Sequence, residues 1–87
     1  MMQAQTAEDR IREFILKHFP IARKNGLKAG EKWLETGMID SLGILDMVHF
    51  LEGEFSVVIS DDELQPENFE SFEAVLEFMQ KKLKNPQ

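Results

Sequence analysis

The tripeptide Asp40-Ser41-Leu42 contains the side chain with the clearest chemical potential in this chain. A serine hydroxyl acts as a nucleophile when a general base lies beside it, and it can also be the attachment point of a prosthetic group. A third possibility is structural, because serine and aspartate are among the residues most favoured at helix N-termini. Ser41 is therefore a candidate catalyst, attachment site or helix cap.

The catalytic role has no supporting residues. The chain has no cysteine, and neither of its two histidines, His18 and His49, has a hydrolase-like spacing from Ser41. An isolated serine lacks the nucleophile–base pair that covalent catalysis needs. His18 is interpreted as a structural residue and His49 as a surface or partner-contact residue, so we expect the protein not to be an enzyme.

The acidic run Asp61-Asp62-Glu63 is the strongest candidate for metal binding, because clustered carboxylates suit hard divalent cations. Its spacing is not that of an EF-hand loop, however. The run also follows Ser60 in the S-x-x-E pattern of a capping box, which predicts the start of a helix. We expect a helix cap here and no metal site.

The elements that would position Ser41 are helical, because apolar residues recur at three- and four-residue spacing. Longer helices are expected at about residues 6–19, 41–55 and 71–83, with a short one opened by Ser60 and limited by Pro66. Residues 20–40 form a long connection, of a length that is often functional. The prediction is an all-α fold, a small bundle of three longer helices plus one short helix, with a long loop between helices one and two.

The helix predicted at residues 41–55 has a buried stripe and additional apolar side chains outside it. The stripe consists of Ile44, Met47, Val48, Leu51 and Phe55. The apolar residues off or at the edge of it are Leu42, Leu45 and Phe50. Gly53 also lies inside this helix, where glycine costs about 1 kcal/mol relative to alanine.

The composition is that of one small folded domain. We expect the 87 residues to form a single domain, 1–87, folded over about 6–83, since 43% hydrophobic residues exceeds the content of disordered chains. The absence of cysteine suits a reducing compartment. No apolar run reaches membrane-spanning length, and residues 1–6 lack the pattern of a signal peptide. We expect a cytoplasmic monomer.

The charge is unevenly distributed along the chain. Residues 1–30 carry six basic and three acidic side chains, residues 31–80 carry one basic and thirteen acidic, and residues 81–87 carry three lysines. Nucleic acid is an unsuitable partner, because binding to its phosphates needs lysine and arginine. Basic patches on other proteins are the natural complement of the acidic middle region.

Four sequence blocks together resemble the acyl carrier protein family, which includes aminoacyl and peptidyl carriers. The blocks are 34–42 (LETGMIDSL), 50–55 (FLEGEF), 59–64 (ISDDEL) and 66–69 (PENF), followed by the closing amphipathic helix. The resemblance covers roughly residues 8–83. Asp-Ser-Leu alone is weak evidence, whereas its combination with the two downstream blocks is specific.

The resemblance implies a role for Ser41 as the attachment site of 4'-phosphopantetheine, with Asp40 and Leu42 beside it. In the family a separate phosphopantetheinyl transferase moves this group from coenzyme A to the serine. The terminal thiol then holds an acyl or aminoacyl group as a thioester, which explains how a chain without cysteine could do thiol chemistry. The partners implied are this transferase, an acyl- or aminoacyl-activating ligase and downstream acyl-processing enzymes.

The family also uses the helix after the serine as its recognition surface. Carried over, the partner-binding residues are Leu42, Leu45, Asp46, His49 and Glu52. Gly43 and Gly53 depart from the family pattern, since these positions are often acidic in carriers of fatty acid synthesis. This departure favours a stand-alone carrier of a specialised pathway, such as secondary metabolite biosynthesis, over the general fatty-acid carrier.

The family further suggests that cargo slips between helices. Candidate linings of such a cavity are Met47, Leu51, Ile59 and Leu64. Trp33 either lines the approach to the arm or anchors the loop. Two other functions stay open: an aminoacyl carrier such as a D-alanyl-type carrier, and a small acidic interaction module without a prosthetic group.

Overall fold

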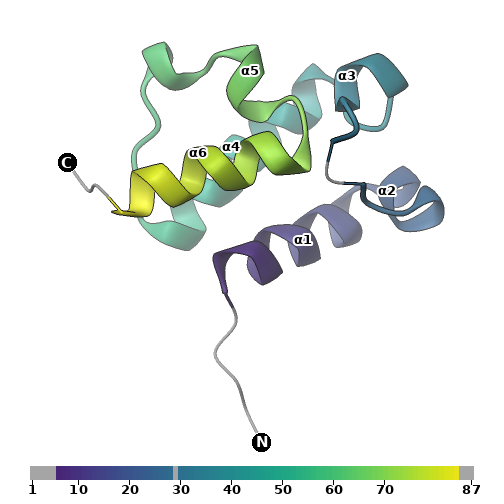
Figure 1. The fold of residues 1–87 in the computed structure, drawn as a ribbon, viewed down its shortest axis with the longest axis horizontal. Coiled ribbons are helices and arrows are strands. Elements are labelled where there is room, and N and C mark those ends of the chain that lie inside the picture. Colours follow the sequence, from purple (N-terminus) through teal and green to yellow (C-terminus); the bar gives the residue numbers. More distant parts are fainter. Residues whose placement is uncertain (1–5, 29, 85–87) are drawn as a thin grey trace, which may run out of the picture.

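The computed structural model describes residues 6–28 and 30–84, and the regular structure in these ranges is entirely helical. This confirms the predicted all-α class. The three longer helices are α1 (Ala7–His18), α4 (Ser41–Phe55) and α6 (Phe72–Lys84). The short ones are α2 (Pro20–Asn25), α3 (Trp33–Thr36), the 3₁₀ turn η1 (Asp61–Glu63) and α5 (Pro66–Phe69). Figure 1 shows α2 and α3 gathered at one end of the molecule, and the C-terminal end of α6 at the other.

Helix α1 begins and ends where its sequence predicts. The Thr6 hydroxyl accepts a 3.1 Å hydrogen bond from the amide of Asp9, and the Asp9 carboxylate accepts one of 3.4 Å from the amide of Thr6, which completes a capping box. The helix stops at His18, before Pro20. Pro20 then occupies the first turn of α2, where its missing N–H costs nothing.

The connection between α1 and α4 contains α2 and α3, so the predicted long loop is partly helical. Trp33 is fully buried, and its amide donates a 2.8 Å hydrogen bond to the carbonyl of Glu70, which follows α5. Met38 and Ile39 are buried as well. Trp33 thus anchors the connection to the core, rather than lining a surface approach.

Helix α4 packs closely against the end of the connection through Gly43. A Cβ atom at this position would lie 2.7 Å from Cγ2 of Ile39 and 2.8 Å from Cε1 of Phe19, so a larger residue does not fit without movement. Of the predicted stripe, Met47, Val48 and Leu51 are buried, while Ile44 and Phe55 are partly buried.

The segment between α4 and α6 differs from the single short helix predicted for it. It contains η1 and α5 in succession, and Pro66 begins α5. In the preceding link Ile59 is buried, but Val58 is 80% exposed, so this link is only partly buried. Helix α6 then starts with the Ser71 hydroxyl accepting a 3.1 Å hydrogen bond from the amide of Ala74, which caps the helix.

No helix within residues 6–28 and 30–84 is long and apolar enough to cross a membrane. We expected residues 1–6 not to form a signal peptide. Residues 1–5 lie outside the part of the chain that the structure describes.

Candidate functional site

The N-terminus of α4 is capped by Asp40 alone. One carboxylate oxygen of Asp40 accepts a 2.8 Å hydrogen bond from the amide of Gly43, and its carbonyl accepts one of 3.0 Å from Ile44. Ser41 is the first residue of the helix and is exposed. Its hydroxyl makes no hydrogen bond with any described residue. The structure therefore separates the capping function, on Asp40, from the free hydroxyl of Ser41.

The same helix end leaves two backbone donors available. Within the described parts of the chain, the amides of Ser41 and Leu42 have no hydrogen-bond acceptor. Free N–H groups and the positive end of the helix dipole favour a negatively charged group at this position. A phosphodiester on the Ser41 oxygen would be stabilised here.

A pocket of about 250 Å³ opens beside Ser41. Its walls are mostly apolar and come from three places: α4, the connection before it, and the segment around α5. The lining residues are Leu34, Ser41, Ile44, Leu45, Val48, Leu64, Gln65, Pro66 and Phe69. The arrangement places an exposed hydroxyl beside a space that suits an aliphatic group.

The structure corrects most of the expected cavity lining. Met47 and Leu51 have no exposed surface and Ile59 is buried, so these three belong to the core. Of the four expected residues, Leu64 alone lines the pocket beside Ser41. Leu45 of α4 also lines the pocket, although we did not include it in the predicted buried stripe.

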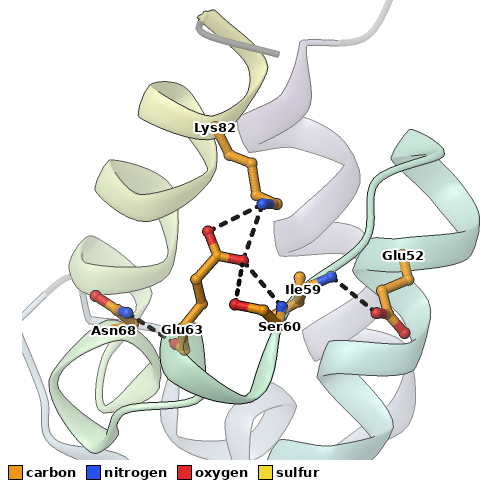
Figure 2. Close-up of polar contacts among 6 residues, drawn as sticks. All are labelled: Glu52, Ile59, Ser60, Glu63, Asn68 and Lys82. Carbon is orange, nitrogen blue, oxygen red and sulfur yellow. Dashed lines mark hydrogen bonds and ion pairs between the residues drawn. The ribbon is translucent and has the colours of Figure 1, made fainter. Parts of the chain in front are cut away.

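Four of the five expected partner-binding side chains lie on the exposed surface of α4. Leu42 is 72% exposed and Leu45 is 47% exposed, and both Asp46 and His49 are exposed. Glu52 has a structural contact, because its carboxylate accepts a 2.9 Å hydrogen bond from the amide of Ile59 (Figure 2). Glu52 thus ties α4 to the segment that follows it.

Glu63 lies at the centre of a second polar cluster, shown in Figure 2. Both carboxylate oxygens accept 2.9 Å hydrogen bonds from Nζ of Lys82, and one accepts a 2.9 Å bond from the amide of Ser60. The Ser60 amide and the Lys82 ammonium group lower the pKa of Glu63 below the ordinary value for a glutamate. The sequence indicated the Ser60 contact, but nothing in it pointed to Lys82, nineteen positions away.

The remaining candidates are the acidic run at residues 61–63, considered for metal binding, and His18. Among the described residues, no group of three or more histidine, cysteine, aspartate or glutamate side chains is arranged to hold a metal ion. The His18 ring packs on Phe14 with ring centroids 4.2 Å apart, and its Nδ1 lies 3.3 Å from the Phe14 carbonyl oxygen. These contacts fit the structural interpretation of His18.

Comparison with known proteins adds one relative of similar length. The chain is 29% identical over 80 residues to PigG, a probable acyl carrier protein of Serratia sp. (strain ATCC 39006). The matched region covers 92% of both proteins. No protein-family model matches the chain. The chain is thus similar, over nearly its whole length, to a protein named as an acyl carrier.

Proposed function

We propose that this protein is a non-catalytic carrier, which holds its cargo as a thioester on 4'-phosphopantetheine attached to Ser41. The observation that carries the proposal is the exposed Ser41 hydroxyl, which is left without a structural role because Asp40 caps α4. Similarity to a probable acyl carrier protein over 92% of the chain supports it.

The residues around Ser41 fit this prosthetic group. Its phosphodiester carries a negative charge, which the free amides of Ser41 and Leu42 and the α4 dipole favour. When bound, the group supplies the thiol that a chain without cysteine lacks. The chain itself contributes an exposed attachment point, a favourable electrostatic environment and an adjoining apolar pocket.

The pocket favours an acyl cargo with an aliphatic chain over an aminoacyl cargo. Among the described residues that line it there is no carboxylate, and the polar side chains are those of Ser41 and Gln65. The ammonium group of an aminoacyl cargo would lose water there without gaining an ionic partner, which is costly. An aliphatic chain would instead bury apolar surface against Ile44, Val48 and Phe69.

The proposed partners are a phosphopantetheinyl transferase, an acyl-activating ligase and acyl-processing enzymes. Leu42, Leu45, Asp46 and His49 form the proposed contact surface, because they are exposed on the helix that begins at Ser41. This surface combines apolar side chains with little charge. A partner that presents apolar side chains beside a basic residue would complement it.

Intact-mass measurement after incubation with coenzyme A, Mg²⁺ and a promiscuous phosphopantetheinyl transferase tests the proposal. The wild type should gain one phosphopantetheinyl group, and Ser41→Ala should gain none. Ser56→Gly is the matched control: Ser56 has the left-handed backbone, at φ 55°, that glycine adopts readily, and this variant should be modified like the wild type. An unmodified wild type, with the transferase active on another carrier, would overturn the proposal in favour of an interaction module.

A further inference from the structure

The pocket wall opposite α4 belongs to a segment with little regular structure. Leu64, Gln65, Pro66 and Phe69 line the pocket, and they lie in and beside α5, a helix of four residues. So short a helix is not stable through its own hydrogen bonds. Contacts to the longer helices must therefore hold this wall in place.

The two ends of the wall are held differently. Phe69 is 2% exposed and its ring packs against Phe78 of α6 with centroids 5.1 Å apart. Leu64, at the other end, is 38% exposed, and its amide bonds only within the turn, to the carbonyl of Asp61 at 3.2 Å. Leu64 thus lacks the buried apolar anchor that Phe69 has.

Glu63, immediately before Leu64, provides the missing attachment. Its carboxylate bonds to Nζ of Lys82 in α6, and its carbonyl accepts a 2.8 Å hydrogen bond from the side-chain amide of Asn68 in α5 (Figure 2). The Lys82 side chain is only 19% exposed, and its Nζ lies 5.9 Å from the centroid of the Phe78 ring. Helix α6 therefore fixes the backbone that presents Leu64 to the pocket.

We propose that Glu63 and Lys82 are positioning residues, which hold Leu64 at the pocket wall and so set the size of cargo that the pocket accepts. The cargo part rests on the proposed carrier function. A partly exposed ion pair opens at modest cost, without unfolding of the domain. When the pair is open, the wall remains anchored at Phe69, and the pocket can widen at Leu64.

Amide hydrogen exchange of the unmodified protein, followed by NMR, tests the positioning role without any prosthetic group. Lys82→Met keeps the aliphatic stem and should accelerate exchange at Ser60 and Leu64 by about two- to fivefold, as expected for one partly exposed ion pair. Lys82→Arg should restore the wild-type rates. Arg10→Met is the matched control, because Arg10 also pairs across two helices, with Glu54 at 3.2 Å, but does not line the pocket. Unchanged rates in Lys82→Met, or equal acceleration in Arg10→Met, would overturn the positioning role.

The cargo role is tested by loading octanoyl- or acetyl-phosphopantetheine from the matching acyl-coenzyme A and measuring thioester cleavage by hydroxylamine. The octanoyl thioester should be protected relative to the acetyl thioester in the wild type. This ratio should fall about two- to fivefold in Lys82→Met, because a wall that opens at Leu64 leaves the octanoyl chain more accessible, and it should recover in Lys82→Arg. If the wild type is loaded but Lys82→Met has the same octanoyl-to-acetyl protection ratio, the cargo role of Glu63 and Lys82 is overturned. The proposed carrier function is then unaffected. No loading of the wild type would overturn the proposed carrier function, and the cargo role with it, while the exchange experiment would still decide the positioning of Leu64.

Discussion

The carboxylate of Asp40 accepts a 2.8 Å hydrogen bond from the amide of Gly43, three residues into α4. This bond satisfies one of the free donors at the start of the helix. The hydroxyl of Ser41, between these two residues, takes no part in the cap. Because Asp40 caps α4 and Ser41 does not, we expect substitutions at these two positions to affect stability differently.

Asp40→Ala should lower the free energy of unfolding by about 1 kcal/mol, the usual cost of a lost N-cap. Ser41→Ala should change it by less than about 0.5 kcal/mol, since the exposed hydroxyl that is lost bonds to none of the described residues. Urea denaturation followed by circular dichroism measures both values. An equal loss in Ser41→Ala would mean that the serine has a structural role in α4.

The two glycines of α4 should respond oppositely to alanine. Gly53→Ala should raise the free energy of unfolding by about 0.5–1 kcal/mol, because a Cβ there meets nothing within 4 Å and alanine favours the helix. Gly43→Ala should lower it by about 1–3 kcal/mol, because the added methyl overlaps Ile39 and Phe19. Thermal and urea unfolding would show this. Stabilisation by Gly43→Ala would mean that the end of the connection yields easily.

Glu63 should make stability depend on pH. Its pKa is lowered in the folded protein by the Ser60 amide and the Lys82 ammonium group. A lowered carboxylate pKa contributes stability that is present above the unfolded-state pKa, about 4.3, and is lost as the pH falls through the folded-state value. Glu63→Gln should therefore be less stable than the wild type at pH 7, and this difference should shrink as the pH falls below about 4.

The matched control for the loss of stability at pH 7 is Glu67→Gln. Glu67 is exposed and makes no hydrogen bond or ion pair with the described residues. Urea unfolding at pH 7 should show a smaller loss for this variant than for Glu63→Gln, because it removes no ion pair to α6. If the stability difference between Glu63→Gln and the wild type grows at low pH, the contacts of Glu63 do not lower its pKa in the folded protein.

The longer helices could be predicted from the sequence because their determinants are local. Ile11, Phe14 and Ile15 recur at helical spacing. Thr6 and Ser71 each cap a helix by bonding to the amide three residues further along the chain. The place of Ser41 after Asp40 marks a helix start, but its proposed role as an attachment site came from the resemblance of residues 34–42, 50–55 and 59–64 to acyl carrier proteins. Periodicity alone did not place the two short helices of the connection, which are too brief to show a repeat.

Of the expected lining residues of the pocket, Leu64 alone was right, because the pocket walls come from distant parts of the chain. Leu34 and Phe69 line the same pocket, and Lys82 bonds to Glu63 over nineteen positions. Such contacts depend on how the helices pack, which a single sequence does not encode as a spacing. Of the apolar stripe of α4, the expected lining residues were Met47 and Leu51, whereas Ile44 and Val48 line the pocket.

Leu42→Asp should separate partner binding from folding. Leu42 is 72% exposed, and an aspartate in the first turn suits the helix dipole, so unfolding should change by less than about 0.5 kcal/mol. If partners bury this side chain, the charge should reduce the kcat/KM of the phosphopantetheinyl transferase by about 5- to 30-fold, equivalent to about 1–2 kcal/mol. Val58→Asp is the control, because Val58 is 80% exposed but lies beyond the opposite end of α4 from Ser41. Equal losses in both variants would show that general surface charge, and not contact at Leu42, determines recognition.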